Sequence, residues 1–287
     1  MPWTLSTSLD DFRTQAGGFL AANPAENTVL LTITDRLAVR GLRYYGDGAP
    51  LFGWWRPEPD APVAGVFLQT PPFAPRLGLM PERAAAELAV ELAGARAGFT
   101  ALAGVGGGVA AVRAFGEAWA GATGTTGTVK TNERLYRLGE LTDPPRPPAG
   151  RPRLAGAGDR ELLIRWFDAF AAEVDIRIPD TAMVVDDRTA DGRLHLWEDE
   201  TGRPVAVAGA SAVVAGMSRI GPVYTPREAR GRGYASGVTA AASAAALADG
   251  AEEVLLHTDL ANPTSNSIYQ QIGYRPVGDC LELAFGD

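Results

Sequence analysis

A proline-rich stretch near the middle of the chain limits what the sequence can fold into more than any other feature. The segment DPPRPPAGRPR, residues 143–153, holds five prolines in eleven residues. Because proline fixes φ and has no amide hydrogen to donate, we expect neither a helix nor a central strand here. A chain of 287 residues is long enough for two ordinary domains. We therefore predict a first domain over residues 1–142, a linker over residues 143–152 and a second domain over residues 153–287.

The overall composition restricts the class of protein. Hydrophobic residues make up 46% of the chain and charged residues 21%, which is typical of a folded globular protein. The formal net charge of −8 repels phosphate backbones, so we expect no nucleic-acid partner. The same charge either favours a cationic acceptor, such as an amine, or simply maintains solubility. The abundance of Ala, Gly, Pro and Arg favours a bacterial source.

The sequence also carries expectations about location and metal binding. No apolar run approaches the length of a membrane span, and the first residues lack the pattern of a secretory signal. We therefore expect a cytoplasmic protein with no membrane partner. Cys280 is the only cysteine, which excludes an intrachain disulfide and a cysteine-rich metal site, and we expect no metal.

The second domain shows a clear pattern of helices and strands. Apolar side chains recur at helical spacing over residues 159–174, with Asp159 as the expected N-cap, and a shorter helix is expected from Pro179. Alternating and β-branched runs predict strands, and runs of strong helix formers predict helices. The predicted strands cover residues 193–199, 204–213, 218–225, 252–259, 274–279 and 281–285, and the further helices cover 234–249 and 263–273, the latter ended by Gly273. This order predicts an α/β fold, an α+β layer built on a mixed sheet.

The segment REARGRGYAS, residues 227–236, has the composition of an anion-binding loop. Gly231 and Gly233 lie between a predicted strand and a predicted helix, whose first N–H groups lack partners within the helix and attract negative charge. Glycine has no Cβ to keep a phosphate away from the backbone, and three arginines add positive charge. The spacing matches neither a Walker A loop nor a dinucleotide-binding fingerprint. We expect a phosphate or pyrophosphate here; the alternative is a flexible turn in solvent.

The same loop resembles a known motif. The segment RGRGYA matches the Q/R-x-x-G-x-G/A motif of the GNAT superfamily of acyl-CoA-dependent N-acyltransferases, and NPTSNSIYQQIGYRPVG, residues 262–278, is similar to its second motif. The resemblance covers residues 153–287, including the order of elements. It implies a GNAT-like fold, with acetyl-CoA as acyl donor and the coenzyme A pyrophosphate held by the loop backbone. The cofactor-binding residues implied in the loop are Arg230, Gly231, Arg232, Gly233, Tyr234, Ala235 and Ser236.

The predicted strand before this loop is interrupted by Gly221 and Pro222, which indicates a bulge or an open edge. In the GNAT superfamily this strand diverges from the next one, and the pantetheine arm binds in the gap. The resemblance therefore implies that the backbone of Val223, Tyr224 and Thr225 faces the pantetheine and the acetyl carbonyl, with free N–H groups that polarise the carbonyl. The alternative is an ordinary edge strand.

Acyl transfer to an amine needs a proton donor for the departing thiolate. Tyr269 matches the family tyrosine that faces the coenzyme A sulfur, and a phenol with a reference pKa of about 10 stays protonated at neutral pH. The alternative is an aromatic ring that packs the helix onto the sheet. Asn262 and Asn266 match positions that often bind the cofactor arm, although Asn262 before Pro263 suits a turn or a helix cap equally well.

No residue stands out from the sequence as the general base. His257 lies in an apolar strand, where a histidine usually belongs to the core, and Asp259 suits a cap of the next segment. Glu173 follows the first aromatic helix, which borders the acceptor site in the GNAT superfamily, so we favour Glu173 as base or acceptor contact. A chain of bound water is an alternative. The candidates considered are Glu173, Asp175, Glu228, His257 and Asp259.

The first half resembles a degenerate copy of the second. Residues 77–98 read as strand, proline and helix, but the helix follows Pro81 directly, with no Arg-Gly-x-Gly loop. The segment GVGGG, residues 104–108, has no basic residue beside it, and we interpret it as a turn. We therefore predict a duplicated GNAT-like fold with one active site, in the second half.

These observations and the resemblance predict an acetyl-CoA-dependent N-acetyltransferase. The expected acceptor is a primary amine of a small molecule, and the protein is expected to be a monomer or a homodimer. The alternatives are acetylation of a protein amine and a non-catalytic acyl-CoA-binding regulatory module. Retention of both the Arg-Gly-x-Gly loop and Tyr269 favours catalysis.

Overall fold

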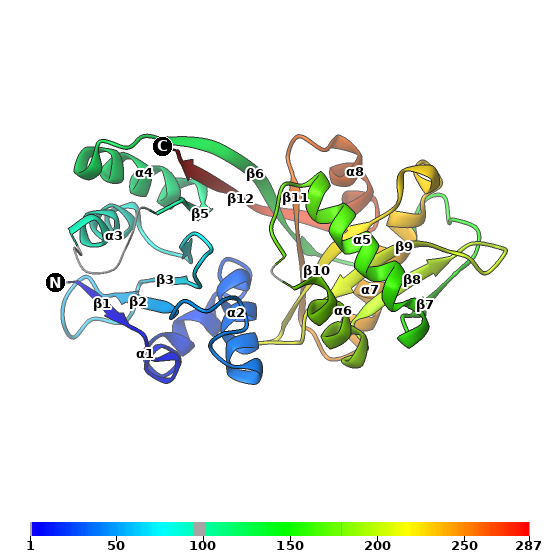
Figure 1. The fold of residues 1–287 in the computed structure, drawn as a ribbon, viewed down its shortest axis with the longest axis horizontal. Coiled ribbons are helices and arrows are strands. Elements are labelled where there is room, and N and C mark those ends of the chain that lie inside the picture. Colours follow the sequence, from blue (N-terminus) through cyan, green and yellow to red (C-terminus); the bar gives the residue numbers. More distant parts are fainter. Residues whose placement is uncertain (1, 95–101, 179, 287) are drawn as a thin grey trace. The chain divides into compact units, whose positions relative to one another are not determined.

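The structure of the chain, a computed structural model, describes residues 2–94, 102–178 and 180–286 (Figure 1). The chain divides into two compact units, each with its own hydrophobic core. The first unit comprises Met1–Leu135, Asp259–Ala261 and Val277–Asp287, and the second comprises Tyr136–Thr258 and Asn262–Pro276.

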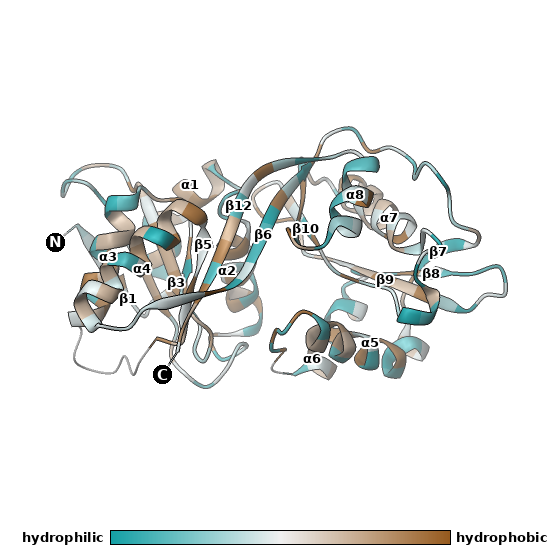
Figure 2. Cartoon of the chain, turned by 90° about the horizontal axis from the view of Figure 1, so that it is seen from above, coloured by the Kyte–Doolittle hydropathy of each residue, from teal (hydrophilic) through white to brown (hydrophobic). Residues whose placement is uncertain are grey.

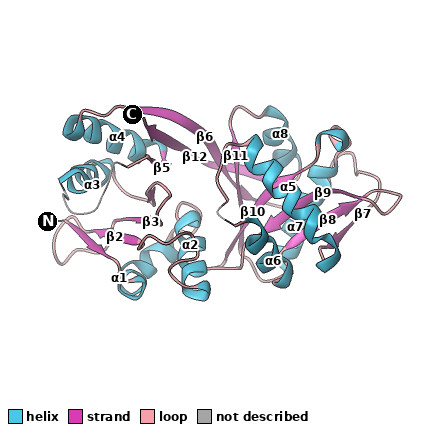
Figure 3. Ribbon diagram, viewed as in Figure 1, coloured by secondary structure: helices cyan, strands magenta, loops and turns pink. Residues whose placement is uncertain are grey.

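The first unit contains the elements of the first half of the chain (Figure 3). They are β1 (Trp3–Ser6), α1 (Leu9–Ala22), α2 (Thr28–Arg40), β2 (Leu51–Trp55), β3 (Gly65–Gln69), β4 (Arg76–Leu77), α3 (Glu82–Gly94), β5 (Gly104–Gly108), α4 (Val109–Thr123) and most of β6 (Gly127–Leu138). Strands β1 to β4 pair antiparallel in that order, and β4 pairs parallel to β5.

The second unit contains most of the remaining elements. They are β7 (Arg151–Leu154), the 3₁₀ turn η1 (Ala157–Asp159), α5 (Arg160–Glu173), α6 (Thr181–Ala190), β8 (Leu194–Glu198), β9 (Pro204–Ala210), β10 (Met217–Tyr224), the 3₁₀ turn η2 (Arg227–Ala229), α7 (Tyr234–Ala248), β11 (Glu253–Asp259), α8 (Pro263–Gln271) and the start of β12 (Tyr274–Phe285). Strands β7 to β10 pair antiparallel in that order, and β10 pairs parallel to β11. The predicted helix start at Pro179 lies outside the described residues.

The two halves of the chain have the same order of elements, which confirms the predicted duplication. Each half runs strand, two helices, three strands, helix, strand, helix and strand. The last strand of each half is exchanged: β12 is the neighbour of β5 in the strand order, and β6 is the neighbour of β11. The pairing of β12 with β5 is antiparallel and extends from Cys280 opposite Gly108 to Ala284 opposite Gly104.

This exchange explains why the compact units differ from the predicted domains. The predicted boundary was placed in the proline-rich segment after residue 142, whereas the units divide between Leu135 and Tyr136 and again within β12. Both β6 and β12 run from one unit into the other. The end of the predicted linker is also a strand, because β7 includes Pro152. β7 is last in the strand order, where a missing amide hydrogen interrupts no pairing on the outer side.

Two predictions about glycine-containing segments were wrong. GVGGG is the strand β5 rather than a turn, because its glycines allow other groups to approach closely: a Cβ at Gly104 would collide with Leu283 O, and one at Gly107 would lie 2.7 Å from Leu77 O. Two strands were predicted on either side of Cys280, where the structure has the single strand β12. β6, also 12 residues long, is the neighbour of β12 in the strand order.

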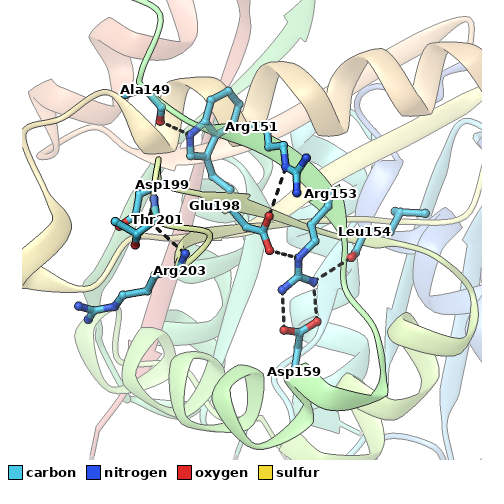
Figure 4. A network of polar contacts seen from close by, with 10 residues as sticks. Ala149, Arg151, Arg153, Leu154, Asp159, Glu198, Asp199, Thr201 and Arg203 are labelled. Carbon is cyan, nitrogen blue, oxygen red and sulfur yellow. Dashed lines mark hydrogen bonds and ion pairs between the residues drawn. The ribbon is translucent and has the colours of Figure 1, made fainter.

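An arginine-centred network fixes the edge strand β7 to the start of α5 (Figure 4). Arg153 donates from Nε to Glu198 Oε1 at 2.5 Å and from its two terminal nitrogens to Asp159 at 2.6 and 2.8 Å. These bonds lower the pKa of both Asp159 and Glu198. Asp159 is the N-cap residue of α5, as predicted, but its carboxylate makes no capping hydrogen bond to that helix and instead binds Arg153 and the Gly156 amide.

The sheet of the second unit is covered on both faces (Figure 2). Leu163 and Phe167 of α5 and Val185 of α6 pack on one face, together with Val207 of β9. Helices α7 and α8 contribute to the core on the other face, where the neighbouring β9 residues Ala206 and Ala208 lie. This alternation along β9 is what a strand buried on both faces requires.

Gly104→Ala should lower the free energy of unfolding by about 1–3 kcal/mol, because the added methyl group collides with the backbone of β12. Gly121 is the matched control, since it lies in α4 with open space around its Cβ position. Gly121→Ala should raise the free energy of unfolding by about 0.5–1 kcal/mol through its better helix propensity. Urea denaturation followed by circular dichroism measures both. Equal effects of the two substitutions would contradict the close packing of β5 against β12.

Candidate active site

The loop between β10 and α7 has the backbone geometry of an anion-binding site. Gly231 and Gly233 have φ values of 79° and 81°, in the left-handed region that favours glycine. Gly233 is also the N-cap residue of α7 and has no side chain with which to cap the helix. The first N–H groups of α7 are therefore available to a group outside the helix.

Two buried hydroxyl groups lie at the beginning of α7. Ser236 is 5% exposed and Thr239 is fully buried, and neither hydroxyl has a hydrogen-bond partner among the described residues. Leaving a buried hydroxyl unpaired costs free energy, so such groups usually indicate a ligand, a water or an ion. Ser236 belongs to the first turn, where a bound anion is expected, so it adds to the case for a ligand at this helix end.

The arginines of the loop do not all point to the same place. Arg230 donates from Nη2 to both oxygens of Glu173, at 2.9 and 2.6 Å, and from Nε to Thr225 O at 2.9 Å. Its guanidinium carbon lies 5.9 Å from the ring centre of Tyr224. Arg227 also pairs with Glu173, at 3.5 Å, whereas Arg232 is exposed to solvent.

The strand β10 has the predicted bulge. Ile220 pairs with Ala210 and Val223 with Ala208 of β9, so Gly221 and Pro222 lie in an interruption of the register. The parallel pairing of β10 with β11 covers Met217 to Arg219, although β10 continues to Tyr224. The second half of β10 therefore diverges from β11, as the resemblance implies, and contains the predicted contacts Val223 and Tyr224. Thr225 follows the strand, and its Oγ1 is a further buried hydroxyl without a partner among the described residues.

Tyr269 lies in α8 and is 6% exposed. Burial raises its pKa to about 12, although a hydrogen bond with Ser265 acts in the opposite direction. Its ring is in edge contact with Tyr274, at 6.2 Å between centroids. A phenol with such a raised pKa stays protonated at neutral pH, which is the state that a proton donor needs.

The two asparagines have identified partners within the protein. Asn262 caps α8, because its Oδ1 accepts a hydrogen bond from Ser265 N at 3.0 Å. The structure thus supplies the capping role that the sequence left open for Asn262. Asn266 accepts a hydrogen bond from the Tyr136 hydroxyl at 2.9 Å and donates to Asn262 O at 2.8 Å.

The candidate bases have different surroundings. Glu173 ends α5 and is held by Arg230 and Arg227. Asp259 belongs to the first unit and accepts a hydrogen bond from Ala261 N at 2.8 Å, whereas the cap of the next helix is Asn262. Glu228 and Asp175 are exposed, and His257 is half-buried in β11. Glu173 thus contacts two arginines of the loop.

Sequence reasoning missed Arg188, in α6. Its Nη1 donates to Gly221 O in the bulge of β10, at 2.6 Å. The available signal was a glycine, Gly209, within the otherwise apolar strand β9, because a glycine in a strand often marks the close approach of another group.

Two further findings come from the described residues alone. They contain no group of three His, Cys, Asp or Glu side chains arranged to hold a metal ion. No helix within them is both long enough and apolar enough to cross a membrane.

Comparison with known proteins identifies the fold. Residues 202–281 match the model of a family described as FR47-like protein, and a search among curated proteins finds no match. A GNAT-family acetyltransferase of Colwellia psychrerythraea has 13% identity and a TM-score of 0.62 over 100% of both chains. A GCN5-related N-acetyltransferase of Sphaerobacter thermophilus has 16% identity and a TM-score of 0.62 over 98% of this chain and 95% of that one. A Drosophila protein has 13% identity and a TM-score of 0.69 over 99% and 98%.

These likenesses confirm the predicted fold. Because both compared GNAT structures match nearly the whole chain, the GNAT fold extends over both halves, as the predicted duplication requires.

A double-mutant cycle should find weak coupling between Glu173 and Arg230. Their side chains are 30% and 45% exposed, so Glu173→Gln and Arg230→Met should couple by about 0.2–1 kcal/mol in the free energy of unfolding. The matched pair is Glu198 and Arg153. The side chain of Glu198 is only 11% exposed, so this pair should couple more strongly. Chemical denaturation of the single and double variants gives both values. Coupling at Glu173 equal to that at Glu198 would mean that the exposed pair is structural.

Proposed function

We propose that this chain is an N-acetyltransferase that moves an acetyl group from acetyl-CoA to a primary amine, with its active site in the second half. The observation that carries the proposal is the loop of Gly231 and Gly233 at the start of α7, next to a strand whose pairing is interrupted. The GNAT fold of the whole chain supports acyl transfer as the reaction class.

The coenzyme A pyrophosphate would bind at the start of α7. Gly231, Gly233 and the first-turn residues Tyr234, Ala235 and Ser236 offer backbone N–H groups, and the Ser236 hydroxyl offers a further donor. Arg232 is the exposed cation of the loop and can approach the phosphates. Arg230 would act differently from the sequence-based expectation, because in this structure it binds Glu173 and Thr225 O.

The acyl end would lie along the second half of β10. Beyond the bulge this strand no longer pairs with β11, so backbone groups of Val223, Tyr224 and Thr225 on that side remain available for the pantetheine arm and the acetyl carbonyl. An N–H group directed at the carbonyl stabilises the negative charge that develops on its oxygen. Asn266 is a further candidate contact for the cofactor arm, and Asn262 would contribute by fixing the start of α8.

Tyr269 is the proposed proton donor to the departing thiolate, and Glu173 the proposed acceptor contact or base. The raised pKa of Tyr269 keeps the proton on the hydroxyl until the thiolate forms. Both oxygens of Glu173 accept hydrogen bonds from Arg230, so taking a proton from the amine would require this ion pair to open. A positioning role for Glu173, holding Arg230 and Arg227 beside the loop, is equally compatible with these contacts.

The acidic character of the chain bears on the acceptor class. A small-molecule amine is favoured, in accordance with the acidic chain, and a protein amine is the second candidate. A non-catalytic acyl-CoA-binding module would keep the loop but would have no use for a buried proton donor. Thiol release from acetyl-CoA with a panel of amines and peptides distinguishes these cases.

One coenzyme A molecule should bind per chain, and Ala235→Glu should weaken its binding. A carboxylate in the first turn suits the helix dipole but repels phosphate, so the dissociation constant should rise at least about tenfold while the melting temperature does not fall. Ala244→Glu, on an exposed position further along α7, is the control. Gly233 is a poorer site for this test, because a Cβ there lies 3.4 Å from Arg146 O. Two equivalent sites per chain in calorimetry, or equal affinity in both variants, would contradict the loop assignment.

Tyr269→Phe should lower kcat by about 10²–10⁴-fold and leave the affinity for acetyl-CoA nearly unchanged, because only the hydroxyl is lost. Since the pKa of Tyr269 is raised to about 12, the wild-type rate should show no loss from its ionisation below about pH 11. Steady-state rates with an active amine, a separate binding constant and the pH profile test this role. A folded Phe variant with the wild-type kcat would show that Tyr269 is not the acid.

A further inference from the structure

The guanidinium group of Arg188 reaches from α6 to the bulge of β10. Its Nη1 donates to Gly221 O at 2.6 Å, and the side chain is half-buried. A hydrogen bond from a charged donor is shorter and stronger than one between neutral groups. The contact therefore holds the Gly221 carbonyl in one orientation, at the point where β9 and β10 lose register.

The neighbouring strand leaves room for this contact. A Cβ built on Gly209 of β9 would lie 2.6 Å from Arg188 Nη1 and 2.8 Å from Gly221 O. Both distances are below those of real Cβ contacts, so any other residue at this position would displace the arginine or the carbonyl. A glycine usually weakens a buried strand. In β9, however, the missing side chain of Gly209 leaves the space that Arg188 Nη1 and Gly221 O occupy.

The position of the next residues depends on the bulge. Val223 and Tyr224 follow Gly221 within the same strand and regain the pairing with β9, opposite Ala208 and Val207. Where the pairing resumes, and in which direction these residues face, is set by how Gly221 and Pro222 are accommodated. A fixed Gly221 carbonyl thereby fixes the backbone that is expected to meet the acyl group.

We propose that Arg188 is a positioning residue, which acts through the bulge of β10 to aim the backbone of Val223 and Tyr224 at the acyl carbonyl of the donor. This inference rests on the proposed function. It predicts that Arg188 matters for recognition of the acyl group and much less for recognition of the coenzyme A part, which binds at the start of α7.

The experiment compares the dissociation constants of CoA and acetyl-CoA for the full chain by calorimetry, and amide hydrogen exchange of the peptide containing residues 220–225. In Arg188→Met, exchange of this peptide should speed up and the affinity for acetyl-CoA should fall about three- to tenfold, the size expected for one weakened hydrogen bond. The affinity for CoA should change less than about twofold. Arg188→Lys, which keeps a charged donor, should recover part of the acetyl-CoA affinity.

Two further variants make the test specific. Arg160→Met removes an arginine of α5 that pairs with Asp186 of α6 at 2.7 Å, without a contact to the bulge, and should leave the ratio of the two dissociation constants unchanged. Gly209→Ala should reproduce the effect of Arg188→Met, and combining the two should add little, because both disturb one contact.

The outcomes separate this inference from the proposed function. A wild-type protein that binds neither CoA nor acetyl-CoA overturns the proposed function and the inference with it. Normal binding of both ligands by wild type, with an unchanged ratio and unchanged exchange in Arg188→Met, overturns the inference alone. Equal losses for CoA and acetyl-CoA in Arg188→Met also overturn it, because they indicate general destabilisation. A selective loss for acetyl-CoA, matched by Gly209→Ala and absent in Arg160→Met, supports it.

Discussion

A strand that pairs fully on both sides has no backbone groups left for a ligand. β10 pairs only partly with each of its neighbours, β11 and β9. Its first three residues pair with β11, while the pairing with β9 resumes only after the interruption at Gly221 and Pro222. The loop, the first turn of α7 and the buried hydroxyls of Thr225 and Ser236 all follow directly from where β10 ends. The candidate site therefore exists because sheet pairing is incomplete, in a unit that is otherwise tightly packed.

Among the described residues near β10, two backbone oxygens accept hydrogen bonds from arginines, whereas two buried hydroxyl groups have no hydrogen-bond partner. Arg188 binds the carbonyl of Gly221 on the side of α6, and Arg230 binds the carbonyl of Thr225 on the side of α5. Two arginines thus each hold a backbone oxygen near β10, while the hydroxyl groups of Thr225 and Ser236 have no partner within the part of the chain that the structure describes. Such a distribution suits a ligand that carries its own acceptors, since donors are left for it and carbonyl groups are already bound.

Local sequence patterns predicted the elements around β10 better than they predicted which strands are neighbours. The bulge and the strand–loop–helix order follow from signals within a few residues, such as Pro222 or the glycines of the loop. Strand exchange could not be predicted, because the partner of a strand is chosen by contacts distant in sequence. GVGGG was misread for the same reason: its glycines serve close approach to Leu283, far along the chain, rather than a local turn. Sequence spacing also gave no indication that Arg230 pairs with Glu173.

The exchange of β6 and β12 also bears on how a duplicated chain can change over time. Each half of the chain contributes its last strand to the other half: β6 lies next to β11, and β12 lies next to β5. Deleting the first half would leave β11 without its neighbour and expose an unpaired edge, which invites aggregation. The first half therefore stabilises the second by supplying the strand next to β11. The second half of such a chain cannot be separated from the first without exposing the edge of β11.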